Sequence, residues 1–208
     1  MEKNLILTHP YPWLPENTRK AVFLVLLVLT IIVMVSLQIL GEPLKTAAAA
    51  GGIVSYELAG TIEQAQTILT SWGTQGQIYA GLNLGLDYLF ILFYVTTIGL
   101  GCVLITQNLT RKMRAPLLVT IGLVLAWGLI LAGLLDCIEN YALIKILLGS
   151  LSGQLATLAR CCAIFKFLLV AAGLVYVIVG GIGILLTKNQ KSSTRTMEKN
   201  HRMVGIKQ

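Results

Sequence analysis

Four long apolar stretches constrain the fold of this 208-residue chain more than any other feature. Polar or charged residues bound each stretch, and the four cover residues 21–40, 81–106, 115–135 and 164–187. Each is close to the roughly 20 residues that an α-helix needs to cross ~30 Å of hydrocarbon. The sequence therefore predicts an all-α membrane protein, in which residues 21–187 form an antiparallel bundle of four transmembrane helices.

The overall composition supports this fold class. Hydrophobic residues make up 56% of the chain and charged residues 12%, whereas charged residues are roughly 25% of a typical soluble domain. A water-soluble core cannot use so much apolar sequence. The net charge of +7 then indicates contact with the lipid bilayer and its anionic inner leaflet, rather than with nucleic acid.

Most of the 16 Lys and Arg residues lie on one side of a four-helix topology. They fall in residues 1–20, in the 106–114 loop and in the segment 188–208. Because basic loops stay inside, this bias predicts a protein of the cell membrane with both termini cytoplasmic. The tail 188–208 either contacts the inner leaflet or is a flexible solvated segment that only sets the topology.

The connection between the first two apolar stretches is too long for a simple turn. Apolar residues recur there at steps of three and four, at Leu58, Ile62, Ala65, Leu69 and Trp72. This spacing predicts an amphipathic helix over about residues 53–72. We expect it to lie on the outer side and cap the bundle, with Trp72 at headgroup depth.

Two carboxylates, Asp87 and Asp136, interrupt the apolar sequence where ionisable groups are costly and are therefore candidates for function. Asp87 and Tyr94 are seven residues apart, which places them on nearly one helix face. Asp136 shares a side of the third helix with two further polar residues by three- and four-residue spacing. The predicted polar cluster at the outer ends of helices 2, 3 and 4 comprises Asp87, Tyr94, Asp136, Glu139, Asn140 and Lys166, with Glu57 approaching from the loop above.

Three functions remain open for this cluster. It fits a structural or accessory membrane subunit whose acids clasp the helices together. It also fits a small transporter or ligand-binding membrane protein, in which the acids hold a cation, a proton or an amine; this alternative requires a cavity between helices 2, 3 and 4. Least favoured is a lipid-active enzyme with paired carboxylates, because neither separated pKa values nor a substrate cavity can be read from the sequence. We assign no catalytic residue.

The other chemical signals are weaker. Cys137 could form a disulfide with Cys161 or Cys162, or all three could be small apolar fillers. The sequence predicts no metal site and no cofactor, since both histidines lie outside the spans and no zinc-ligand spacing occurs. Glycine-rich faces on helices 2 and 4, at 81–85 and 180–183, predict close packing within the chain, in a homodimer or against a partner membrane subunit.

Two motifs carry a resemblance to a known group of proteins: Leu86-Asp-Tyr-Leu-Phe with Tyr94, and Leu134-Leu-Asp-Cys-Ile-Glu-Asn140. The chain resembles a widespread, poorly characterised family of small four-span integral membrane proteins with Leu-Asp-x-Leu-Phe…Tyr and Leu-Asp-x-Ile-Glu-Asn signatures. The family's Phe-Glu-Leu-Ala-Gly motif has a counterpart at residues 55–60, with Tyr56 in place of Phe. The resemblance covers about residues 53–185. It implies the same fold and a common location for Glu57, Asp87, Tyr94, Asp136, Glu139 and Asn140, but no reaction.

Overall fold

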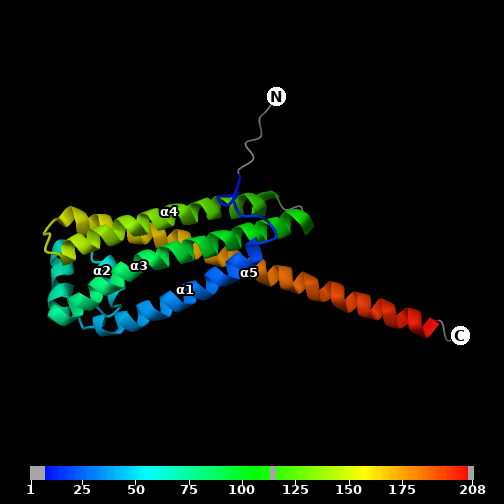
Figure 1. Ribbon diagram of the computed structural model, residues 1–208, viewed down its shortest axis with the longest axis horizontal. Coiled ribbons are helices and arrows are strands. Elements are labelled where there is room, and N and C mark those ends of the chain that lie inside the picture. Colours follow the sequence, from blue (N-terminus) through cyan, green and yellow to red (C-terminus); the bar gives the residue numbers. More distant parts are fainter. Residues whose placement is uncertain (1–7, 113–115, 206–208) are drawn as a thin grey trace, which may run out of the picture.

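The computed structural model describes residues 8–112 and 116–205, with the backbone alone at 111–112, 185 and 187–205. Within these ranges the chain is helical apart from its connections and one isolated β-bridge between Thr46 and Ala49. The elements are α1 (Arg19–Gly41), the 3₁₀ turn η1 (Glu42–Leu44), α2 (Ile53–Glu57), α3 (Ile62–Lys112), α4 (Pro116–Leu147) and α5 (Gly153–Gly205) (Figure 1). Helices α1, α3, α4 and α5 are each long and apolar enough to cross a membrane. The predicted four-helix membrane architecture is confirmed.

Helix α3 forms the centre of the bundle. It packs against α1, α4 and α5, and 61% of its most apolar stretch is buried, compared with 6% in α1 and in α5. The outer faces of α1 and α5 consist of exposed apolar side chains such as Ile32 and Val179. Water would disfavour this surface, whereas the hydrocarbon of a bilayer solvates it.

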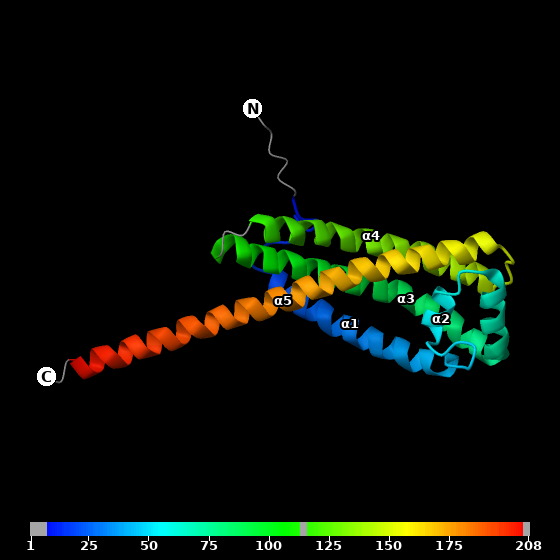
Figure 2. The same ribbon diagram turned by 180° about the vertical axis from the view of Figure 1, so that it is seen from behind.

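The connections alternate between the two ends of the bundle, as an antiparallel arrangement requires. The start of α1, the end of α3, the start of α4 and the far part of α5 lie toward one end (Figures 1 and 2). Helix α2 and the α4–α5 turn lie at the opposite end (Figure 2). Pro116 occupies the first position of α4, where its missing N–H removes no helical hydrogen bond.

The segment from η1 to the bend at Gly73, which includes α2, forms a cap over one end of the bundle. Helix α2 packs against α3, α4 and α5. Tyr56 donates a hydrogen bond from its hydroxyl to the carbonyl oxygen of Leu143 at 3.0 Å, and Trp72 Nε1 donates to the carbonyl oxygen of Leu44 at 2.7 Å. The two aromatic rings meet edge to face at 5.3 Å between centroids. The first hydrogen bond fixes the cap to α4, and the second ties Trp72 to η1, which directly follows α1.

The single helix predicted over residues 53–72 is not confirmed. Residues 53–57 and 62–72 are helical, but non-helical residues, including Gly60 at φ +73°, separate them. The second piece is the beginning of α3 and bends into the long helix at Gly73, where φ +58° and ψ −173° are accessible to glycine without steric cost. Trp72 is buried at 6% exposure rather than placed on the outer surface, because the bend turns it into the cap.

The membrane helices are longer than predicted. The expected ranges 81–106 and 164–187 lie inside α3 and α5, α4 contains residues 116–135 of the expected third range, and 21–40 nearly equals α1. The prediction ended helix 3 before Asp136 and began helix 4 after Arg160 because polar residues usually bound a span. In the structure, buried polar partners allow α4 to continue through Asp136. The tail is likewise helical to Gly205, so at the level of the backbone it extends α5.

Several glycines let helices approach within the chain. A methyl group added at Gly173 on α5 would lie 2.7 Å from Leu129 Cδ2, and one added at Gly180 would collide with Ile105. Gly85 and Gly181, in contrast, have nothing within 4 Å on their open sides. Among Gly85, Gly180 and Gly181 of the predicted glycine-rich faces at 81–85 and 180–183, only Gly180 packs closely within the chain, and Gly173 does so outside those faces. The predicted homodimer or partner subunit stays a prediction.

Candidate functional site

The seven residues predicted to share a site come from four helices. Glu57 is on α2, Asp87 and Tyr94 are on α3, Lys166 is on α5, and α4 contributes Asp136, Glu139 and Asn140. Spacings of three, four and seven residues align the side chains on each helix, and the packing of α3, α4 and α5 brings those faces together. We refer to these seven residues as the polar cluster.

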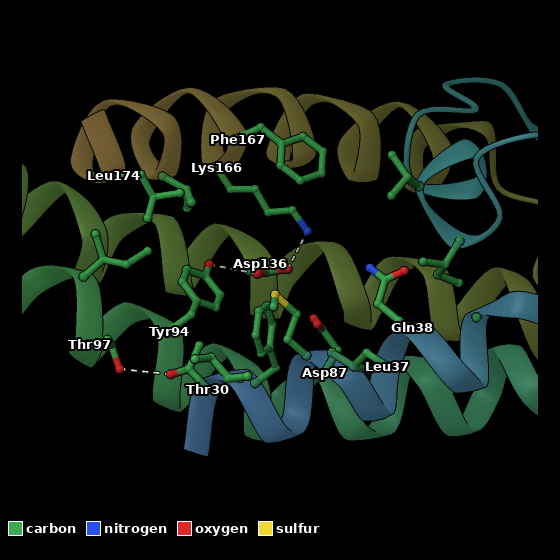
Figure 3. Close-up of a pocket in the computed structure, with 18 of the residues that line it drawn as sticks. Thr30, Leu37, Gln38, Asp87, Tyr94, Thr97, Asp136, Lys166, Phe167 and Leu174 are labelled. Atoms are coloured by element: carbon green, nitrogen blue, oxygen red, sulfur yellow. Dashed lines mark hydrogen bonds and ion pairs between the residues drawn. The ribbon is translucent and has the colours of Figure 1, made fainter. Parts of the chain in front are cut away.

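Lys166 is the centre of the polar cluster. Its Nζ atom lies 2.7 Å from Asp136 Oδ1, 2.9 Å from Glu139 Oε1 and 3.6 Å from Glu57 Oε2. All four residues are buried. The Tyr94 hydroxyl donates to the second oxygen of Asp136 at 2.9 Å. One ammonium group therefore joins α2, α4 and α5. Figure 3 shows Lys166 and Tyr94 both hydrogen-bonded to Asp136, so that Tyr94 ties this carboxylate to α3.

Asp87 stands apart from this ion network. Its Oδ2 accepts a hydrogen bond from Asn140 Nδ2 at 2.6 Å. Among the residues whose side chains the structure describes, no lysine or arginine forms an ion pair with Asp87. Its side chain is partly exposed, whereas Asp136 is 3% exposed. Asp87 is thus the carboxylate of the polar cluster that is most open to a further partner.

The polar cluster leaves several buried atoms without hydrogen bonds within the described residues. They are Glu57 Oε2, Glu139 Oε2 and Asn140 Oδ1. Burial raises the pKa of Glu57 to about 7 because it disfavours the charged form; Lys166 opposes this shift, and Asp136 and Asp87 add to it. Glu57 is therefore poised to bind or release a proton near neutral pH.

A cavity of about 570 Å³ opens beside the polar cluster. Its walls come mainly from α1, α3 and α5, with part of the cap at one end (Figure 3). Glu57, Asp87, Asp136 and Lys166 line the polar end. Toward the other end the lining is mostly apolar, and it comprises Phe23, Leu27, Ile98, Val170, Leu174 and Val177.

The cavity also faces the outer surface of the bundle. Helices α1 and α5 each pack on α3, but they do not pack extensively on each other. Ile31 and Met34 of α1 and Leu174 of α5 line the cavity and are also 41–46% exposed. The cavity is therefore a groove between α1 and α5 that opens sideways, toward the lipid surrounding the bundle.

The structure differs from the sequence-based description of this site in two respects. The polar cluster was expected at the outer ends of the helices, but Asp136 lies about three turns before the end of α4 and Lys166 more than three turns after the start of α5. The required cavity was expected between helices 2, 3 and 4, whereas α1 forms one of its walls. Thr30 and Gln38 of α1 line it as well, and these polar residues in an apolar stretch were the sequence signal that was missed.

The cysteines that could form the predicted disulfide are unpaired. Among the four cysteines of the chain, Cys102 and Cys162 are buried, Cys137 is half-buried and Cys161 is exposed. The disulfide from Cys137 to Cys161 or Cys162 is therefore not formed in this structure. In the described part of the chain, no group of three or more His, Cys, Asp and Glu residues has a geometry suited to a metal ion.

The four long apolar helices, the outward apolar faces and the buried polar cluster define a multi-pass membrane protein of helical-bundle type. Comparison with known proteins adds no family: no protein-family model, curated protein or solved structure matches the chain.

Proposed function

We propose that this membrane protein binds a small amphipathic molecule in the groove between α1 and α5, with the molecule's polar group beside Asp87 and Glu57. The observation that carries the proposal is the cavity of about 570 Å³, which joins exposed apolar residues to buried carboxyl groups. Its volume is within the roughly 300–1,000 Å³ of ordinary ligand sites. Solid packing around the Asp136–Lys166 pair would have argued against ligand binding.

The polar cluster divides between two roles in this proposal. Asp136 accepts hydrogen bonds at both oxygens, from Lys166 and from Tyr94, and therefore serves to hold the helices together. Asp87 and Glu57 line the cavity and keep acceptor capacity for a ligand. We do not propose catalysis by paired carboxylates, because both oxygens of Asp136 already accept hydrogen bonds, from Lys166 and from Tyr94.

The proposed orientation places both termini in the cytoplasm and the cap on the outer side of the cell membrane. The distribution of basic residues supports it, although Lys3, Arg111, Lys112, Arg114 and the charged side chains of the tail lie outside the described side chains. In this orientation the polar cluster lies nearer the outer than the inner end of the bundle. The ligand would then enter from the membrane rather than from the cytoplasm.

A photoreactive lipid analogue tests the proposal directly. Hexadecanol carrying a diazirine on its chain would be added to the protein in phosphatidylcholine vesicles, irradiated, and the labelled peptides of α1 and α5 quantified. Leu174→Trp fills the groove, since Leu174 lines it; Leu168→Trp is the matched control, because Leu168 is exposed on the same helix and does not line the cavity. Several-fold loss of labelling at groove residues in Leu174→Trp alone is expected. Equal labelling of all three proteins would overturn the proposal.

A second candidate is a structural or accessory membrane subunit. It is supported by the ion network around Lys166, which ties three helices together without any need for a ligand. The open sides of Gly85 and Gly181 would suit a close contact with another helix. Stable co-purification with a second membrane protein from native membranes supports this candidate, and solitary behaviour counts against it.

A further inference from the structure

We infer that the amphipathic ligand carries a protonated amine, which binds Asp87, on an apolar chain that lies between α1 and α5. This inference rests on the proposed function and names the chemical class of its ligand. Three observations lead to it: the excess of acid in the polar cluster, the position of Asp87, and the length and lining of the groove.

The polar cluster holds more acid than its own base can balance. The polar cluster contains four carboxyl groups, from Glu57, Asp87, Asp136 and Glu139, and only one ammonium group, that of Lys166, which lies within 4 Å of three of them. Lys166 makes its two hydrogen bonds with Asp136 and Glu139. In surroundings of low dielectric constant an uncompensated carboxylate is costly. The site therefore favours an added positive charge, either a proton, as at Glu57, or a cation.

Asp87 is the carboxylate best placed to receive that cation. It lines the cavity, is partly exposed there, and has the Asn140 amide as its side-chain hydrogen-bond partner. Glu57, which is nine-tenths buried, lines the same end of the cavity; its Oε2 atom accepts no hydrogen bond, and Lys166 Nζ is 3.6 Å from it. An ammonium group has three donors and no acceptor, and it therefore matches two carboxyl groups that need donors.

The rest of the groove requires an apolar chain rather than a bare metal cation. On α1 the lining includes Gln38, near the polar end (Figure 3), and extends as far as Phe23. These positions are 15 residues apart, or ~22 Å along the helix. One leaflet of hydrocarbon is ~15 Å deep, so the groove is long enough for the chain of a membrane amphiphile. Its apolar lining and its opening toward lipid suit such a chain, and neither is needed for an inorganic ion.

The test compares head groups on one chain. Three hexadecyl probes with the same diazirine and a terminal amine, alcohol or carboxylate would be added in turn to the protein in neutral phosphatidylcholine vesicles at pH 7. We expect the amine to label groove peptides about tenfold more than the alcohol, because a hydrogen bond between two charged groups is stronger than one from a neutral hydroxyl. The carboxylate should label least. Asp87→Asn, which keeps the shape of the side chain, should abolish the preference for the amine.

Glu63→Gln is the matched control, because Glu63 is an exposed acid of the cap and does not line the cavity. It should leave the preference for the amine intact. Equal groove labelling by the amine and the alcohol would overturn the inference and leave the proposed function standing. Loss of groove labelling with every probe would overturn both. Preference for the carboxylate would assign the site to Lys166 instead. The comparison in the wild-type protein decides these outcomes even if Asp87→Asn does not fold.

Discussion

Lys166 Nζ and Asp136 Oδ1 lie 2.7 Å apart, and their side chains are 7% and 4% exposed. Replacing Lys166 with Met removes the ammonium group while keeping most of the apolar volume. Asp136 and Glu139 then lose their buried cation, which typically costs about 3–5 kcal/mol. We expect Lys166→Met to lower the yield of folded protein and its unfolding midpoint in detergent.

Lys145→Met is the control for this change, since Lys145 is an exposed lysine on α4. It should behave like the wild-type protein. If Lys166→Met also unfolds at the wild-type midpoint, the ion network does not stabilise the bundle. The accessory-subunit candidate would then lose its main support.

Glu57 makes stability depend on pH. The pKa of Glu57 is about 7 in the folded protein and near 4.5 in the unfolded chain. Between these two pH values the folded state therefore retains a proton that the unfolded state releases. Stability should therefore fall as the pH rises from about 4.5 to 7, and the loss should persist above 7. Glu57→Gln cannot ionise, so its unfolding midpoint should fall less between pH 5 and pH 8 in detergent.

The groups that face Glu57 must be considered in that experiment. Lys166 on α5, Asp136 and Glu139 on α4, and Asp87 on α3 all influence its titration. The informative quantity is therefore the slope of the unfolding midpoint against pH, compared between Glu57→Gln and the wild-type protein. Glu63→Gln, in the exposed part of the cap, should keep the wild-type slope. Identical slopes for Glu57→Gln and the wild-type protein would show that Glu57 does not titrate in this range.

Two glycines on α5 lie in different environments: Gly173 packs against α3 and α4, whereas Gly181 is on an open face of the helix. A methyl group at Gly173 would meet Leu129 Cδ2 at 2.7 Å and Ile98 Cγ2 at 3.1 Å, so Gly173→Ala should force α5 away from α3 and α4. Overpacking of this kind typically costs about 1–3 kcal/mol. Gly181→Ala meets nothing within 4 Å and should be neutral. Denaturant unfolding in detergent measures both.

The Gly181 result also bears on assembly. A neutral Gly181→Ala in the isolated protein, combined with loss of a dimer in membranes, would assign the open face of α5 to a homodimer. If Gly173→Ala is as stable as the wild-type protein, α5 does not pack as closely against Leu129 as the structure places it.

The membership of the polar cluster could be predicted because helical spacing is a local property. Asp87 and Tyr94 share a face through their seven-residue separation, and Asp136 shares one with Glu139 and Asn140. The polar faces of α3 and α4 were expected to pack against each other, because ionisable groups inside a membrane are costly unless they pair. The placement of Glu57 beside Lys166 at 3.6 Å follows the same reasoning.

The position of the polar cluster and its cavity could not be predicted in the same way. Polar residues were interpreted as the ends of helices, but partners such as Lys166 satisfy Asp136 and allow α4 to continue to Leu147. The groove exists because α1 and α5 pack on α3 and leave space between them. That space depends on tertiary packing, which the periodicity of a single helix does not report.

Thiol labelling tests the proposed orientation. Cys161 is exposed and lies in the first part of α5, at the capped end of the bundle, whereas Cys102 and Cys162 are buried. A membrane-impermeant maleimide added to intact cells should therefore modify Cys161, and Cys161→Ser should remove most of the signal. A cysteine introduced at Lys20, an exposed residue at the start of α1, should react only after the cells are permeabilised. The opposite pattern would invert the topology and place Asp87, Glu57 and the polar end of the groove on the cytoplasmic side. In that event an amine ligand would have to be supplied from the inner leaflet.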